Sequence, residues 1–258
     1  MTEPTSPFHD PLWPHRWSAR EPVIDAIVPH LFDALNPRPG ERILDVGTGA
    51  GSIAFPVAGA GAEVVAADIS EPMISFIRAR AAERGIANAM FLVADAASGS
   101  IPGAPFHAAT SLFGVMFFPD PMPAFANIRR QLLPGARFVF ACWTSAEDNP
   151  LHPDVLIGPS ISGGWPLEGP DPGPFSLADV HHTRHLLASA GFVEIHRRRI
   201  DVRATVPREA VYGDELVEHL APGLRRAALE AMALQITPFE TSGGVRVPLA
   251  FQLYSATA

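Results

Sequence analysis

The sequence predicts an α/β protein built on a doubly wound sheet of seven mostly parallel strands. Short apolar segments, typical of buried strands, alternate with segments of helical periodicity along most of the chain. Strands that follow one another through helices pair in parallel with right-handed crossovers, which places helices on both faces of the sheet. The 258 residues, 47% of them apolar, are enough for one domain with elaborations.

The expected elements begin with a proline-rich tail, followed by a helix at 22–36 that Pro29 interrupts. Strands are expected at 42–47, 63–68, 89–95, 107–113, 136–143, 192–202 and 245–256. Helices are expected near 50–60, 71–84, 121–133 and 176–190. This alternation of strands and helices is the basis of the predicted sheet.

Two segments interrupt the alternation. Residues 144–174 are rich in proline and glycine without a sustained period, and a loop of that length within a compact domain is usually a binding element or lid. Residues 207–236 have the pattern of an amphipathic helical insertion. We therefore expect a single domain over 1–258 with a lid-like loop and one insertion.

The acidic balance of the chain limits its partners. The net charge is −8 and the isoelectric point is about 5.6, so phosphate backbones are repelled and nucleic acid is not an expected partner. The basic run 196–199 lies on an expected strand, where it suits a solvated face or edge. All 19 basic residues are arginine, which excludes lysine Schiff-base chemistry and a phosphate-loop lysine.

The sequence also lacks the features of a disulfide, a metal site, a leader and a membrane span. The single cysteine, Cys142, excludes an intrachain disulfide, and its apolar neighbours place it in a buried strand. Paired histidines or clustered carboxylates at ligand spacing are missing near the expected fourth strand, so no metal is expected. The amino terminus lacks the basic and apolar regions of a leader, and no apolar run approaches the ~18 residues of a spanning helix. We expect a cytoplasmic protein without a membrane partner.

The stretch from Ile43 to Gly51, ILDVGTGAG, predicts a ligand-binding loop. Glycine has no Cβ, so the glycines at every second position can take positive φ and let a ligand lie against the backbone at a helix start. They are Gly47, Gly49 and Gly51. A dinucleotide fingerprint would need glycine at Ser52. The acid ahead of the loop, Asp45, suits an ammonium group, which favours a ligand whose end near the loop is an amino acid.

Two further acids end the next two expected strands. Asp68 closes EVVAAD, where a carboxylate can hold a ribose diol by two hydrogen bonds. Asp95 closes MFLVAD and is followed by Ala96, a position suited to an adenine amino group. Each acid could alone be a helix cap or a solvated loop residue. Ligands of open α/β sheets bind outside the carboxyl ends of the strands, which favours a shared site for the three acids.

With these motifs the chain resembles the class I S-adenosylmethionine-dependent methyltransferases, in particular their small-molecule branch, which acts on quinones and natural products. The matching segments, in order, are ILDVGTGAG, VVAADIS, FLVADAA, FHAATSLFGVMFFPDP, LLPGARFVFACW, PFSLADVHHTRHLLASAGFVEI and, weakly, VRVPLAFQLYSATA. Thr48 replaces a frequent cysteine and Ala136 a frequent glycine, and neither change removes a ligand group.

This resemblance implies a Rossmann-like sheet whose last strand runs antiparallel between its neighbours, and S-adenosylmethionine as the cofactor. Beside the acids and glycines already named, it implies cofactor contacts from further residues. They are Ile69, Met73, Ala96 and Leu112. Trp17, in the segment WPHRW, is expected to cap the cofactor by stacking, or alternatively to fasten the tail to the domain.

The resemblance implies methyl transfer to an oxygen or nitrogen of a small molecule. His152, in the loop after the fifth strand, is our candidate general base. Aromatic residues where cofactor and acceptor would meet predict an apolar or aromatic acceptor, although they equally suit the core. They are Phe113, Phe117, Phe118 and Trp143.

Three other readings stay open. The same cofactor pocket could serve a reaction without methyl transfer, such as cyclisation or isomerisation. A NAD-linked oxidoreductase is disfavoured by Ser52 and by the missing lysine. A non-catalytic cofactor sensor is the third alternative, and the sequence leaves open whether the chain forms a homodimer.

Overall fold

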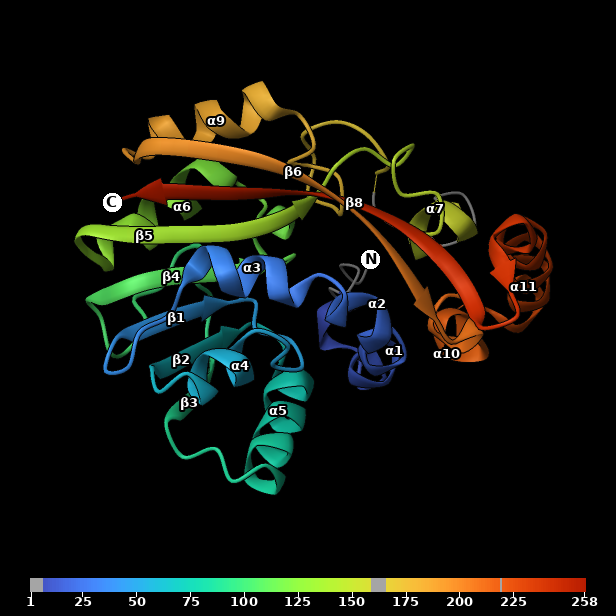
Figure 1. Cartoon of the computed structure of the whole chain (residues 1–258), viewed down its shortest axis with the longest axis horizontal. Coiled ribbons are helices and arrows are strands. Elements are labelled where there is room, and N and C mark those ends of the chain that lie inside the picture. The colour runs from blue at the N-terminus through green and yellow to red at the C-terminus, as the bar shows by residue number, and fades with distance from the viewer. Residues whose placement is uncertain (1–6, 159–165, 219) are drawn as a thin grey trace, which may run out of the picture.

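A computed structural model describes residues 7–158, 166–218 and 220–258 (Figure 1). Its central feature is one sheet with the strand order β3-β2-β1-β4-β5-β8-β6, to which the short β7 is added by pairing with β8. The strands are β1 Arg42–Val46, β2 Glu63–Asp68, β3 Ala89–Val93, β4 Phe106–Leu112, β5 Leu132–Trp143, β6 Val193–Val206, β7 Glu240–Thr241 and β8 Gly244–Thr257.

The strand directions confirm the predicted topology. The strands from β3 to β5 pair in parallel, whereas β8 is antiparallel to both β5 and β6. β6 therefore runs parallel to β5, with the inverted β8 between them. The central strand β1 pairs on both sides, Ile43 with Val64 of β2 and with Ala108 of β4, and residues 43–46 are all buried. A short apolar strand of this kind suits the middle of a parallel sheet.

Helices cover both faces of the sheet. They are α3 Val28–Leu35, α4 Ala54–Gly59, α5 Glu71–Glu83, α6 Pro121–Arg130 and α9 Val180–Ser189. α3 packs on β4 and β5, α4 on β2, and α5 on β2 and β3, whereas α6 packs on β5 and α9 on β6 and α6. In Figure 1, α3 and α4 lie in front of the sheet and α6 lies behind it.

Several expected boundaries were wrong: the helices expected from 50 and from 176 begin at Ala54 and Val180, and the strand expected to end at 202 ends at Val206. Two further differences have a clear physical reason. The helix expected at 121–133 ends at Arg130, because β5 begins at Leu132 rather than at residue 136. Leu132 pairs with Phe106 of β4 before a shift in register, so tertiary pairing extends the strand through a sequence that looks like a turn. The helix expected at 22–36 is divided into α2 Glu21–Asp25 and α3, and Pro29 lies in the first turn of α3, where its missing N–H costs little.

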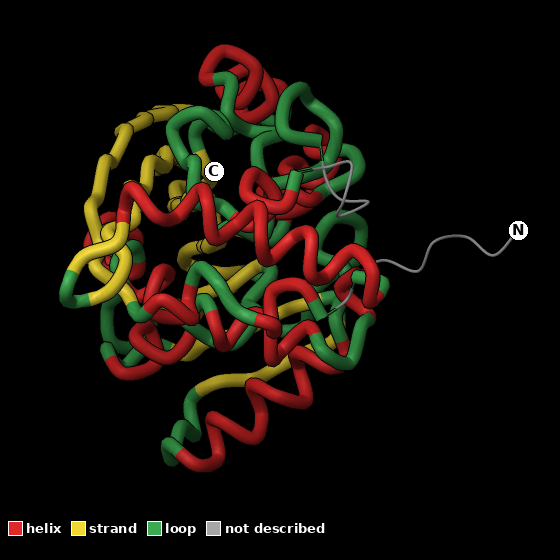
Figure 2. Tube along the Cα trace, turned by 90° about the vertical axis from the view of Figure 1, so that its right-hand side faces the viewer, coloured by secondary structure: helices red, strands yellow, loops and turns green. Residues whose placement is uncertain are grey.

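Among the described residues, five further helices gather at the carboxyl ends of the parallel strands, the side that faces the viewer in Figure 2. They are α1 Trp13–Ala19, α2, α7 Pro153–Ile157, α10 Asp214–Val217 and α11 Pro222–Ile236. We call these five helices the cap. α1 contacts α5 and α10, and α7 contacts α11. The proline-rich tail expected ahead of residue 22 is partly helical, because α1 and the 3-10 turn Pro7–His9 lie there.

The expected lid and insertion both lie at this side of the sheet. Part of the lid, residues 159–165, lies outside the described residues, and the described part contains α7. Residues 207–236 hold the 3-10 turn Arg208–Ala210 together with α10 and α11, and the turn Thr237–Phe239 follows. Over the described ranges, no helix has both the length and the apolar character needed to cross a membrane.

Candidate functional site

The glycine loop connects β1 to α4 and needs its glycines for space. Gly47, Gly49 and Gly51 all have positive φ, at 65°, 53° and 87°. A Cβ on Gly47 would lie 3.0 Å from the Cα of Gly114, and one on Gly51 would lie 2.8 Å from a methyl carbon of Ile77. The loop therefore brings bare backbone to the carboxyl edge of the sheet, as the sequence predicts.

Asp45 lies beneath this loop and is 1% exposed. Its Oδ2 accepts a hydrogen bond from the Thr48 hydroxyl at 2.7 Å, while its Oδ1 is buried and has no partner among the described residues. Burial, with a smaller contribution from the charge of Asp68, raises the pKa of Asp45 to about 7. A buried carboxylate with an unused oxygen is suited to a cationic ligand group.

Replacing Asp45 by asparagine is expected to stabilise the ligand-free protein at pH 8 by about 1–2 kcal/mol. The ordinary Asp pKa is near 4, so between pH 4 and pH 7 the folded chain holds more protons than the unfolded chain, and the stability falls as the pH rises. Asparagine removes this penalty, and the gain should vanish near pH 4. Thermal melts at both pH values measure it, with the exposed Asp120→Asn as control. An equal gain at pH 4 and pH 8 would contradict the assignment.

Asp68, at the end of β2, holds two neighbouring segments together. Its Oδ2 accepts a hydrogen bond from the Gly49 N–H at 3.0 Å, and its Oδ1 accepts one from the Ser70 N–H at 2.9 Å. Burial raises the pKa of Asp68, and these backbone hydrogen bonds oppose the rise. A carboxylate has about four acceptor positions, so each oxygen keeps one for a further donor. The side chain stays partly exposed.

The third strand-end acid is placed differently from the other two. Asp95 is exposed, and its carboxylate accepts hydrogen bonds from the Ala97 N–H at 2.8 Å and the Ser98 hydroxyl at 2.5 Å. The next residue, Ala96, is buried, and its carbonyl accepts from the Asn127 side chain. Asp95 thus closes its own turn, and no helix begins there, so it is the exposed loop residue rather than the helix cap that the sequence left open.

The apolar side chains that the resemblance implies as cofactor contacts differ in their exposure. Ile69, which follows β2, is 40% exposed, and Leu112, at the end of β4, is 5% exposed. Met73, in the first turn of α5, is fully buried, and its N–H donates a hydrogen bond to the hydroxyl of Ser70, the N-cap residue of that helix. Ile69 and Leu112 therefore lie at the strand ends, whereas the Met73 side chain belongs to the core packing.

Trp17 of α1 lies directly over the glycine loop. A Cβ built on Gly49 would be 3.6 Å from Cε2 of the Trp17 ring. The indole Nε1 is buried and has no partner among the described residues. Trp17 Nε1 and Asp45 Oδ1 are thus a spare donor and a spare acceptor beside one loop. Such a pair fits the carboxylate and ammonium groups of an amino acid, so the residues present suit the methionine end of S-adenosylmethionine.

The amino-terminal segment is fastened over the strand ends by contacts that the sequence did not reveal. The Ser70 hydroxyl donates to the Phe8 carbonyl, and the Phe8 ring meets Phe117 edge to face at 5.2 Å. At the other end of the segment, Glu21 pairs with Arg80 of α5. These contacts connect the first helices to the loop after β2, to the exit of β4 and to α5.

Aromatic rings line the ends of β4 and β5. Phe113 has a φ of 61° and stacks on Trp143 at 4.1 Å between ring centroids, and both are buried. Of the four aromatic residues predicted near the acceptor, these two therefore lie together. Phe117 and Phe118 are only partly buried, and Phe118 packs against Phe125 of α6.

His152 is the N-cap residue of α7, and its ring lies against this aromatic cluster. Its ring meets Trp143 and Phe175 edge to face at 5.5 and 5.2 Å. Nδ1 accepts a hydrogen bond from the Asp154 N–H at 3.3 Å and lies 3.3 Å from Asp154 Oδ2. Burial, aided by the charge of Arg20, lowers the pKa of His152 well below 6.5. The imidazole is therefore neutral at pH 7.

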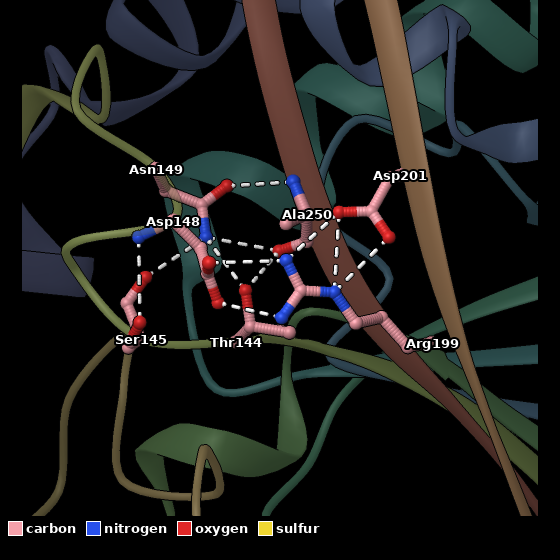
Figure 3. A network of polar contacts seen from close by, with 7 residues as sticks. All are labelled: Thr144, Ser145, Asp148, Asn149, Arg199, Asp201 and Ala250. Atoms are coloured by element: carbon pink, nitrogen blue, oxygen red, sulfur yellow. Dashed lines mark hydrogen bonds and ion pairs between the residues drawn. The ribbon is translucent and has the colours of Figure 1, made fainter.

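A polar network holds the loop that carries His152 (Figure 3). The buried Asn149 side chain donates to the carbonyls of Ser145 and Ala250 and to the Thr144 hydroxyl, and its Oδ1 accepts from the Ala250 N–H. The Asn149 carbonyl in turn accepts from the His152 N–H at 3.0 Å. Arg199 of β6 pairs with Asp148 and Asp201 beside it. The network fixes the His152 backbone to β8.

The other candidate functional groups are the thiol of Cys142 and the side chains that could ligate a metal. Cys142 is buried, and burial raises the pKa of its thiol, so it is not an activated nucleophile. Within the ranges that the structure describes, no group of three or more His, Cys, Asp or Glu side chains could hold a metal ion.

Comparisons with known proteins agree with this geometry. A family profile described as "Methyltransferase domain" matches residues 43–135. Nocamycin O-methyltransferase of Saccharothrix syringae is 32% identical over 71% of this chain and 70% of its own length. Aklanonic acid methyltransferase DauC of a Streptomyces species is 36% identical over 49% of this chain and 63% of its own length. The crystal structure of YcgJ from Bacillus has a TM-score of 0.63 at 16% identity, covering 89% of this chain and 97% of YcgJ, which shows the shared fold.

Proposed function

Because this chain belongs to the small-molecule branch of the class I S-adenosylmethionine-dependent methyltransferases, we propose that it methylates an oxygen or nitrogen of a small, largely apolar or aromatic metabolite. Two of its relatives carry names that refer to natural products, nocamycin and aklanonic acid. This supports a natural-product acceptor. The aromatic cluster of Phe113, Trp143 and Phe175 beside His152 supports an acceptor with an apolar or aromatic body.

The unpaired Asp45 Oδ1 beneath the glycine loop is the observation on which the cofactor assignment depends. Asp45 would hold the amino group of the cofactor and Trp17 Nε1 its carboxylate, while Asp68 would accept hydrogen bonds from the ribose diol. Ile69, Leu112 and the turn at 95–96 would border the adenosyl group. When bound, S-adenosylmethionine supplies a methyl group on a positively charged sulfur, and the protein's contribution is alignment and exclusion of water.

We assign His152 the removal of the acceptor's proton. A base must be unprotonated and must offer a lone pair to the acceptor. The lowered pKa of His152 satisfies the first condition at pH 7. The second needs a change of tautomer, because Nδ1 now accepts the Asp154 N–H and the proton of the neutral ring is on Nε2. In the tautomer that the base needs, the proton is on Nδ1, and Asp154 Oδ2, 3.3 Å away, would accept it. Nε2 is then the proton-accepting atom, and Asp154 stabilises the imidazolium that forms.

The function is tested by following both products of the reaction. We expect the purified protein, given S-adenosylmethionine with a deuterated methyl group and a panel of phenols, hydroxyquinones and aromatic acids, to form S-adenosylhomocysteine and a deuterium-labelled product in equal amounts. Mass spectrometry measures both. An acceptor converted without S-adenosylhomocysteine would indicate a reaction without methyl transfer. Failure of calorimetry to detect binding of S-adenosylhomocysteine would refute the cofactor assignment.

A further inference from the structure

Arg20 lies where the cap meets the exit of β5. It follows α1 and precedes α2, one helical turn after Trp17. It lines a narrow pocket whose other walls include Val23, Trp143, His152, Val211 and Leu249. Burial lowers the pKa of Arg20, and the charge of Asp154 opposes this change. Arg20 is half-buried, and its guanidinium stays charged at neutral pH.

Three other inward-placed arginines have a direct partner, whereas Arg20 has none among the described residues. Arg16 pairs with Asp10, Arg80 with Glu21, and Arg137 with Glu41. The Arg20 guanidinium donates no hydrogen bond to any described residue, and no described carboxylate lies within 4.0 Å of it. Asp154 acts on it only at longer range. Arg20 is half-buried, so its unused donors stay open to a ligand that enters the pocket.

The surroundings specify what kind of ligand would fit. The walls beside Arg20 are mostly apolar or aromatic, from Trp143 to Leu249, and His152 is neutral. Planar guanidinium groups match the two oxygens of a carboxylate, and they also bind single oxyanions such as an ionised phenol or enol. The cavity volume is about 10 Å³, which is room for one small polar group, so the pocket suits the anionic oxygen group of a molecule whose apolar body lies at its mouth.

We propose that Arg20 binds an oxyanion of the acceptor, so that the metabolite this enzyme accepts is an apolar or aromatic organic acid. This inference rests on the proposed function, because it concerns the acceptor side of the same site. The cofactor also carries a carboxylate, on its methionine end. The spare donor nearest the glycine loop is Trp17 Nε1, whereas Arg20 acts on His152 and Asp154. This placement assigns Arg20 to the acceptor.

The test compares anionic and neutral probes on the complex with S-adenosylhomocysteine. Benzoate and 2-naphthoate are titrated against benzamide and 2-naphthamide, which have nearly the same shape without the charge. Ligand-observed NMR measures the affinities. We expect the wild-type complex to bind the carboxylates about tenfold or more tightly than the amides, as expected for hydrogen bonds to a charged group. Arg20→Gln should remove this preference, Arg20→Lys should keep part of it, and the exposed Arg226→Gln should leave it unchanged.

Calorimetry of S-adenosylhomocysteine alone separates the two carboxylate sources. We expect its affinity to change less than about twofold in Arg20→Gln. Equal affinities of wild-type protein for carboxylates and amides, or no binding of the carboxylates, would overturn the proposal. So would an Arg20→Gln variant whose main loss is in S-adenosylhomocysteine affinity, since that would assign Arg20 to the cofactor. If wild-type protein fails to bind S-adenosylhomocysteine, the proposed function fails. The wild-type comparison needs no variant to fold.

Discussion

Replacing His152 by alanine is expected to lower kcat by at least about 100-fold, because a positioned general base typically contributes that much or more. The affinity for S-adenosylhomocysteine should stay within about twofold of wild type, since His152 lies beside Trp143 and Phe175 rather than at the glycine loop. Initial-rate kinetics and calorimetry measure the two quantities. His181→Ala, on the exposed start of α9, is the matched control and should have normal kcat.

The pH dependence separates a base from a structural histidine. A base works in its neutral form, and the pKa of His152 is lowered by burial and by Arg20. The activity of the wild-type enzyme should therefore persist as the pH falls below 6.5, the ordinary His value, and should be lost only further down. Asp154→Asn should lower kcat and move this acidic limb, because the partner of Nδ1 is changed. Full activity of His152→Ala would remove His152 from the mechanism.

The sequence was sufficient for the features that depend on local pattern. The strand, the alternating glycines and the acids Asp45 and Asp68 occupy consecutive short segments, and their spacing fixes them at one edge of a parallel sheet. The alternation of strands and helices was equally sufficient for the parallel part of the sheet, whereas the antiparallel last strand between its neighbours was implied by the family resemblance.

The features that the sequence did not reveal depend on tertiary contacts. α1 lies in a proline-rich segment, and its position over Gly49 is set by contacts of Phe8 and Glu21 with parts of the chain far away in sequence. No pattern in the sequence indicated Arg20, because the absence of a hydrogen-bond partner among the described residues is visible only in the folded structure. The environment of His152 needs Phe175 and the Asn149 network, which no spacing rule connects.

Two predicted contacts show how local chemistry can compete with a ligand. An aspartate at a strand end can face a ligand, close its own turn or do both, and each Asp95 oxygen accepts one hydrogen bond from its own turn. Met73 follows the Ser70 cap, and helical geometry turns its side chain into the core. A motif gives the position of such residues along the chain, whereas their orientation depends on the neighbours that the fold supplies.

Replacing Asp68 by alanine is expected to weaken the binding of S-adenosylhomocysteine by about 1.5–3 kcal/mol, or roughly 10-fold to 150-fold. Each Asp68 oxygen accepts one backbone hydrogen bond, from Gly49 or from Ser70. One further acceptor position on each oxygen matches the two hydroxyl groups of a ribose. Calorimetry measures the affinity, and Asp120→Ala at an exposed position is the control.

The substitution also removes the link between Asp68 and the glycine loop, so the loss of affinity has two separable sources. Asp68→Asn keeps one oxygen for a backbone N–H and loses the charge, and it should retain the thermal stability of wild type better than Asp68→Ala does. A 2′,3′-dideoxy form of S-adenosylhomocysteine isolates the diol. If Asp68 binds the diol, wild type should bind this analogue more weakly than S-adenosylhomocysteine. Asp68→Ala should bind the two ligands with equal, weak affinity. A variant that still distinguishes the two ligands as strongly as wild type would assign the ribose to another residue.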